Sequence, residues 1–397
     1  VQTLENLEMK KTLVAIAALA ATGAFAQSSV TLYGVVDAGY NSFSAQNGTA
    51  AKVTQSGIGY SAADTSRWGM KAVEDIGGGL KGGVTIESTL ASNPRENFSF
   101  SLLGAAAPGT DFTMEGRGQT TQVQRIGDRI MTVDLTSGSH TINAGNQAQP
   151  TRGVAVGFQA DGSNLVGNTV GNDTFLTGRV PAVTYIFNAG HGLNVSGSYL
   201  NNTKKKDGYD NVKTANGYAA KAEYANGPLA AAAVWTKQTT DTALTYTTKQ
   251  AAVDLKTQNL TPTASLGATT KSVETTATVL GVSYDLQPVR VYAQYAGIKN
   301  EDTKTTAYTN NDKRHSMSLG ARYFIGDSYF FGQVSNGKNQ ITGTNTDYDW
   351  KGHSFGYKHA LSKRTVAYVG VGKAEYGTSA TTKATGKETA FGLLHSF

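Results

Sequence analysis

The sequence contains no cysteine, which excludes disulfide bonds, a thiol nucleophile and metal sites with cysteine ligands. Proline is also scarce, with 7 residues against 46 glycines in 397 positions. This balance suits strands joined by tight turns and lacks the proline load of a disordered chain. No uncharged apolar run reaches the roughly 18 residues that a membrane-spanning helix needs. The sequence therefore offers no candidate for such a helix.

Motifs for catalysis and for cofactor binding are also absent. The six histidines show no metal-ligand spacing, since His353 and His359 lie six positions apart with no paired ligand. The stretch Gly-Val-Gly-Lys at 370–373 lacks the spacing of a phosphate-binding loop, and no Gly-x-Ser-x-Gly elbow occurs. We expect no catalytic residue, no metal and no cofactor. An enzyme embedded in a membrane barrel stays open as an alternative.

The N-terminal residues read as a targeting segment. Two lysines (Lys10 and Lys11), an apolar run that ends at Phe25, and Ala-Phe-Ala at 24–26 are typical of a secretory signal peptide. We assign it to residues 9–26, with cleavage before Gln27. Residues 1–8 precede Met9 and are interpreted as translated upstream sequence that is not native structure. Residues 27–397 are then expected to form one domain.

Apolar and polar residues alternate in many short stretches, which predicts β-strands because side chains alternate faces along a strand. Counting gives seven hairpins with short Gly, Asn, Asp or Pro connections, plus one strand at each end, or sixteen strands in all. Long polar connections are expected at 41–66, 91–124, 148–178, 201–217, 238–272, 299–315, 336–347 and 374–387.

Short turns at one end and long loops at the other describe an all-β transmembrane barrel, sixteen-stranded and antiparallel, with periplasmic turns and external loops. The variable loop lengths argue against a repeat propeller. Loops above about fifteen residues argue against a soluble β-sandwich.

The two faces of the predicted strands differ in charge. Arg67 and Lys71 alternate with Trp68 and Met70, and Asp37 shares a face with tyrosine and threonine. A charge on the lipid face costs about 2–4 kcal/mol at the membrane midplane. The charged face is therefore expected to line the lumen, and sixteen strands enclose a lumen wide enough to hold water.

The last stretch, 390–397, places Phe391, Leu393, His395 and Phe397 on one face. We expect it to pair with residues 29–40, because a barrel in lipid must close to remove its edges.

Three stretches resemble general porins of β-proteobacteria (the Burkholderiales and Neisseriales type). Residues 65–81, which include Arg-Trp-Gly-Met-Lys and Glu-Asp-Ile-Gly-Gly-Gly, resemble the hairpin of the second and third strands. Residues 29–37 resemble the first strand, and 355–365, with Leu-Ser-Lys-Arg-Thr, resemble a late hairpin. The resemblance implies a homotrimer in the Gram-negative outer membrane, exported by a signal peptide. It also implies that Phe397 signals insertion to the barrel assembly machinery.

The resemblance further implies that the third external loop, residues 148–178, folds into the lumen and forms a constriction. Wall arginines of the family face acids from this loop and from the third strand. The pattern 144–147, Ala-Gly-Asn-Gln, lacks an arginine usual at the end of the fifth strand. The residues that we expect at the constriction are Arg67, Lys71, Asp37, Glu87, Arg179, either Arg125 or Arg129, and either Asp161 or Asp173.

We expect passive diffusion of small hydrophilic solutes and ions. The formal net charge of +6 and the lumenal basic residues favour anions modestly. A substrate-selective channel is the alternative of the same class. The charge is spread along the chain, so no nucleic-acid partner is expected. Lys204, Lys205 and Lys206 lie in a predicted loop, where they could contact lipopolysaccharide phosphates in the outer membrane.

Overall fold

The computed structural model describes residues 29–49, 51–61, 63–90, 98–101, 113–116, 126–161, 165, 167, 170, 176, 178–201, 213–243, 270–302, 312–341, 346–377 and 383–397. The predicted upstream extension and signal peptide lie outside these described residues. So do the candidate pore residues Arg125 and Asp173 and the lysines at 204–206.

Almost all regular structure in the described residues is β-strand. The first strands are β1 (Ser29–Asn47), β2 (Val53–Tyr60), β3 (Arg67–Gly77), β4 (Leu80–Thr89), β7 (Ile130–Ser137), β8 (His140–Ala148) and β9 (Arg179–Gly190). The others are β10 (Leu193–Asn201), β11 (Lys213–Asn226), β12 (Leu229–Ala243), β13 (Thr270–Asp285), β14 (Val289–Asp302), β15 (Asp312–Ile325), β16 (Ser328–Ile341), β17 (Thr346–Ala360), β18 (Thr365–Gly377) and β19 (Ala384–Ser396). A separate small sheet pairs β5 (Phe98–Ser101) with β6 (Thr113–Gly116), and the helix α2 spans Pro150–Gly157.

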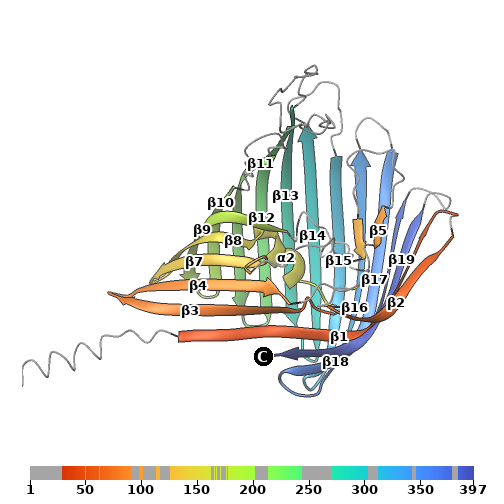
Figure 1. Ribbon diagram of the computed structural model, residues 1–397, viewed down its shortest axis with the longest axis horizontal. Coiled ribbons are helices and arrows are strands. Elements are labelled where there is room, and N and C mark those ends of the chain that lie inside the picture. The colour runs from red at the N-terminus through yellow and green to blue at the C-terminus, as the bar shows by residue number, and fades with distance from the viewer. Residues whose placement is uncertain are drawn as a thin grey trace, which may run out of the picture.

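The strands form a closed ring in which neighbours run antiparallel (Figure 1). One edge of β1 pairs with β19, and its other edge pairs with β3 in its first half and with β2 in its second half. Because β2 and β3 share one place beside β1, the ring has sixteen positions, and the predicted barrel is confirmed.

Several strands extend further than the sequence predicts. The predicted loop 41–66 is wrong, because β1 continues to Asn47 and β2 pairs with it from Val53. Similarly, β12 continues to Ala243 and β16 to Ile341. Hydrogen bonds between backbones are enough to form these extensions, so their side chains need not alternate between apolar and polar. Strands are predicted from that alternation, and the extensions therefore escape prediction.

The turn between β3 and β4 is tight because its Glu-Asp-Ile-Gly-Gly-Gly motif ends in three glycines. Gly77, Gly78 and Gly79 all have positive φ angles, of 97°, 62° and 81°. Side chains other than hydrogen disfavour this left-handed region, so three glycines allow the chain to reverse within the turn.

The outward face of the ring is apolar, and its inward face is polar except where the lumenal loop packs against it. Leu32, Leu319 and Leu393 are 64%, 61% and 52% exposed, whereas the inward Gln333 and Ser354 are fully buried against loop residues. Such an inversion of the soluble pattern suits strands surrounded by lipid. No helix in the described part of the chain is long and apolar enough to cross a membrane.

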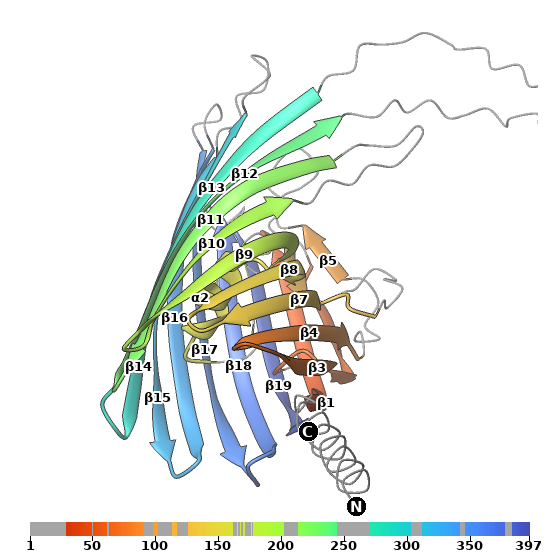
Figure 2. The same ribbon diagram turned by 90° about the vertical axis from the view of Figure 1, so that its left-hand side faces the viewer.

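The third external loop enters the lumen, as predicted, and α2 lies inside the ring of strands (Figure 2). Its Val154 and Ala155 are fully buried in a cluster with inward-facing residues of the opposite strands, namely Ala232, Val234, Ala277, Val279, Ala296 and Ile298. Polar side chains of the same wall hold its backbone. The Gln294 side chain donates to the carbonyls of Val154 and Ala155 at 2.9 and 3.0 Å.

The chain after α2 is fixed to the wall in the same way. Arg322 donates to the carbonyl oxygens of Ala160 and Gln159 at 2.7 and 3.1 Å, and the Gln333 side chain accepts the Ala160 N–H at 2.8 Å. One side of the lumen is therefore covered by a helix and the backbone that follows it.

Candidate functional site

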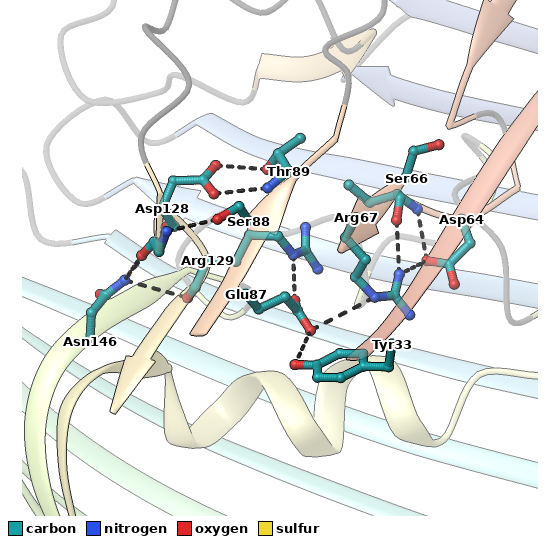
Figure 3. Close-up of polar contacts among 12 residues, drawn as sticks. Tyr33, Asp64, Ser66, Arg67, Glu87, Ser88, Thr89, Asp128, Arg129 and Asn146 are labelled. Carbon is teal, nitrogen blue, oxygen red and sulfur yellow. Dashed lines mark hydrogen bonds and ion pairs between the residues drawn. The ribbon is translucent and has the colours of Figure 1, made fainter. Parts of the chain in front are cut away.

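The other side of the lumen carries a cluster of charges centred on Glu87 of β4 (Figure 3). The Nε of Arg129 donates to one carboxylate oxygen of Glu87 at 2.5 Å. The Arg67 Nε lies 3.9 Å from the second oxygen, which also accepts the Tyr33 hydroxyl at 3.2 Å. Glu87 and Arg129 are both buried, at 8% exposure, so little solvent screens their ion pair.

Tyr33 reaches Glu87 across an intervening strand. In the sheet register, Tyr33 of β1 lies opposite Gly69 of β3, which lies opposite Glu87 of β4. A Cβ atom at position 69 would lie 2.3 Å from the tyrosine ring. Glycine is therefore required here for the ring to pass over β3 and bond the carboxylate.

Arg67 has a second carboxylate partner, just upstream of its strand. Its Nη1 donates to Asp64 Oδ1 and to the Thr65 carbonyl, both at 2.9 Å. The guanidinium group is thus held between Asp64 and Glu87, and its direction in the lumen is fixed by several contacts.

Arg129 follows a short junction that is also fixed. The Asp128 carboxylate accepts the Thr89 N–H at 2.9 Å and the Thr89 hydroxyl at 2.7 Å. The Gly127 N–H donates to the Ser88 hydroxyl at 2.8 Å. These bonds connect the end of β4 to the start of β7, so Arg129 enters the lumen at a defined point (Figure 3).

Two further arginines complete the cluster. Arg179 opens β9 where the loop returns to the wall, and the Gln149 N–H donates to the Gly178 carbonyl at 3.0 Å beside it. Arg129 and Arg152, the latter on α2, are the charged groups that act most strongly on Arg179. Burial and the charge of Arg129 lower the pKa of Arg152. Four guanidinium groups are therefore gathered near the carboxylates of Asp64, Glu87 and Asp128.

Residues 12–379 match the model of a protein family described as Gram-negative porin. The chain belongs to this family. It is 29% identical to outer membrane porin protein 32 of Delftia acidovorans, over 91% of this chain and 88% of the relative. It is 27% identical to an outer membrane porin of Bordetella pertussis, over 91% of this chain and 93% of the relative. The protein is accordingly an outer-membrane porin that crosses the membrane many times.

Solved structures agree on the fold. An anion-selective porin from Comamonas acidovorans superposes with a TM-score of 0.61 at 20% identity, covering 94% of this porin and all of that chain. A trimer form of OmpT from Vibrio cholerae gives a TM-score of 0.57 at 12% identity, covering 92% and 99% of the two chains.

The predicted constriction residues that the structure describes fall into three groups. Arg67, Glu87, Arg129 and Arg179 lie together in the charged cluster described above. Lys71 lies two positions along β3 from Gly69, on the face that Arg67 uses, and is exposed.

Two acids predicted at the constriction are instead buried. Asp37 is completely inaccessible and accepts the Tyr368 hydroxyl at 2.7 Å, so its predicted exposure to the channel is wrong. Asp161 is equally inaccessible and accepts the Ser354 hydroxyl at 3.0 Å. Asp161 follows α2 at a point where the chain lies against the wall, so its side chain points to β17 and not to the aqueous path. It therefore anchors the loop to β17.

Four contributors to the cluster are not among the residues predicted from the sequence, namely Arg152, Asp64, Asp128 and Tyr33. Arg152 is the only basic residue of the predicted loop 148–178, and that isolation was a usable signal. Asp64 lies in a stretch predicted as polar loop, where acids are common and uninformative. Tyr33 was placed on the lumenal face, but its partner depends on strand register, which the sequence does not reveal.

Proposed function

We propose that this porin lets small hydrophilic solutes and ions diffuse passively, with a preference for anions set by Arg67, Arg129, Arg152 and Arg179. The observation that carries the proposal is the gathering of these four guanidinium groups beside three carboxylates. Fixed charges of one sign in a narrow aqueous path raise the local concentration of the opposite ion.

The arrangement also gives the constriction two unlike sides. Arg67 of β3, Glu87 of β4 and Arg129 just before β7 lie on one wall, whereas α2 packs its buried apolar residues on the opposite wall and contributes Arg152 to the cluster. Charges that are unequally distributed around the path produce a field across it, which orients polar solutes and penalises apolar ones. No chemical step is required, and we propose no enzymatic activity.

The assembly and its partners belong to the same proposal. A trimer form is known for the Vibrio cholerae OmpT structure, and we propose a homotrimer for this porin. Lipid, lipopolysaccharide and the barrel assembly machinery are the proposed contacts in the outer membrane.

A salt gradient across a planar bilayer tests the ion preference. Purified porin should give a reversal potential on the anion side, because the cluster holds more guanidinium groups than carboxylates among the described residues. A potential on the cation side would overturn the proposal.

The alternative of a substrate-selective channel is tested with liposomes. A general pore lets sugars and organic acids of rising mass enter with a smooth decline in swelling rate. Saturation by one solute would instead favour a selective channel.

Replacing Glu87 with glutamine should increase the anion preference. The change removes the carboxylate that Arg67 and Arg129 share, while the amide keeps the size of the side chain. We expect the anion-to-cation permeability ratio to rise about threefold, as for one charge acting across a few ångströms of mostly aqueous medium. The matched control is Glu74→Gln, an exposed acid of β3 near the turn. An equal shift in both variants would contradict a specific role for Glu87.

A further inference from the structure

The strand beside β1 is interrupted between β2 and β3. Ala38 pairs with Tyr60 and Val35 pairs with Arg67, so six residues lie opposite only two of β1. We call residues 61 and 63–66, which the structure describes, the inward segment. Its Ala63 is buried in a cluster with Leu165 of the lumenal loop and with Phe331, Tyr368 and Ala390 of the inner wall. The excess chain therefore projects into the lumen.

One buried carboxylate organises this segment. Asp37 Oδ2 accepts the N–H groups of Ala63 at 2.6 Å and of Asp64 at 2.8 Å. The Asp37 backbone N–H donates to the Ser66 hydroxyl at 3.0 Å, and its carbonyl accepts the Ser61 N–H at 3.0 Å. Both ends and the middle of the inward segment are thus bonded to the same residue.

The second oxygen of this carboxylate is bonded from across the closure of the barrel. Tyr368 of β18 donates its hydroxyl to Asp37 Oδ1 at 2.7 Å. Between them lie Gly392 of β19 and Gly39 of β1, which face each other in the register. A Cβ atom at either glycine would lie within 2.8 Å of the tyrosine oxygen. The two glycines therefore leave a path for Tyr368 to span β19.

We propose that Asp37 is a positioning residue for the constriction. It holds the inward segment so that Asp64 stays on the Arg67 guanidinium, and Tyr368 fixes the carboxylate that does this. This role deepens the function proposed above, and its effect on ion selectivity rests on that function. Without Asp37, the Ala63 and Asp64 N–H groups lose their acceptor, and buried donors without partners are costly.

The first test measures the inward segment directly. The chain has no cysteine, so Ala63→Cys introduces a unique thiol at a position only 3% exposed. A charged, membrane-impermeant methanethiosulfonate reagent should modify it slowly in otherwise unchanged porin. We expect the rate to rise about tenfold or more with Asp37→Ala, as for losing charge-assisted hydrogen bonds. Asp37→Asn retains one acceptor oxygen and should give a smaller rise.

The control is Ser198→Ala, which removes another buried hydrogen bond of the inner wall, to Thr184 at 2.9 Å, away from the inward segment. It should leave the rate unchanged. Folding of every variant is checked by heat-modifiable gel mobility. Should Asp37→Ala not fold, Tyr368→Phe, which removes only the hydroxyl, serves in its place with an expected rise of a few-fold. Equal rates in the Asp37 or Tyr368 variants and the control would overturn the proposal.

The second test asks whether the position of Asp64 matters for ions. Asp64→Asn should shift the reversal potential toward anions, and this shift should shrink at least by half when Asp37 is alanine. An undiminished shift would overturn the positioning role. A faster thiol reaction with no effect of Asp64→Asn in either background would keep Asp37 as the holder of the segment. It would overturn the charge role of Asp64 under the proposed function, so the two failures are distinguishable.

Discussion

Replacing Arg179 with glutamate should move the porin from anion preference toward cation preference. Arg179 is half-buried at the point where the loop rejoins the wall, and it makes no ion pair with the described residues. Its charge is therefore not neutralised by a direct ion pair with a described residue, and it can act on passing ions, although Glu87 and Asp128 lie near enough to influence it. Reversal changes the cluster by two charges, and we expect the anion-to-cation permeability ratio to fall about tenfold. Reversal potentials in a salt gradient measure this ratio.

The matched control for this charge reversal is Arg364→Glu. Arg364 is exposed in the turn between β17 and β18, away from the constriction. The same change in net charge there should leave the ratio near its original value. The anion-to-cation permeability ratio of Arg179→Gln should lie between those of the original porin and Arg179→Glu. Identical shifts at positions 179 and 364 would mean that net charge sets selectivity, whatever its location.

Deleting Phe397 should strongly reduce the amount of folded porin. The Phe397 N–H donates to the Gly34 carbonyl at 3.1 Å, and the Gly34 N–H donates to the Phe397 carbonyl at the same distance. The phenyl ring also lies over Gly34, where a Cβ atom would be 2.3 Å from it. The deletion removes both backbone bonds of this closing pair and exposes polar groups of β1 to lipid. We expect at least a several-fold loss of heat-modifiable barrel in outer-membrane fractions.

Two variants separate the ring from the backbone in this prediction. Phe397→Ala keeps the two backbone hydrogen bonds and removes only the ring. If these hydrogen bonds close the barrel, this variant should assemble better than the deletion. Phe355→Ala removes an aromatic ring that is similarly exposed on β17 and should assemble normally. In barrels that do form, ion selectivity should be unchanged. Normal assembly of the deletion would show that this pair contributes nothing to closure.

The strand order and the barrel could be predicted because alternation and turn residues are local signals. Arg67 and Glu87 could also be placed on the lumenal face by alternation, and their contact follows from the β3–β4 hairpin. The burial of Asp37 could not be predicted. It depends on Tyr368, which lies 331 positions away and reaches it over two glycines.

The loop contacts illustrate the same limit. Asp161 is a candidate because the resemblance implies that acids of this loop line the constriction, yet its environment is set by Ser354 and Gln333, from strands far along the chain. Arg152 is not among the predicted residues, although it is the lone basic residue of the loop. Side-chain neighbours of a loop that folds inward depend on the barrel being complete, and no local pattern carries that information.

The position of α2 also imposes an order on assembly. The helix and the chain after it are bonded to Gln294, Arg322 and Gln333, on strands from the later half of the chain. The ring closes where β1 meets β19, through pairs such as Asn41 with Glu388, which are 347 positions apart. Loop closure over such a separation is slow. Hairpins should therefore form first, the loop should dock while one side of the sheet is still open, and the joining of the first and last strands should seal it inside.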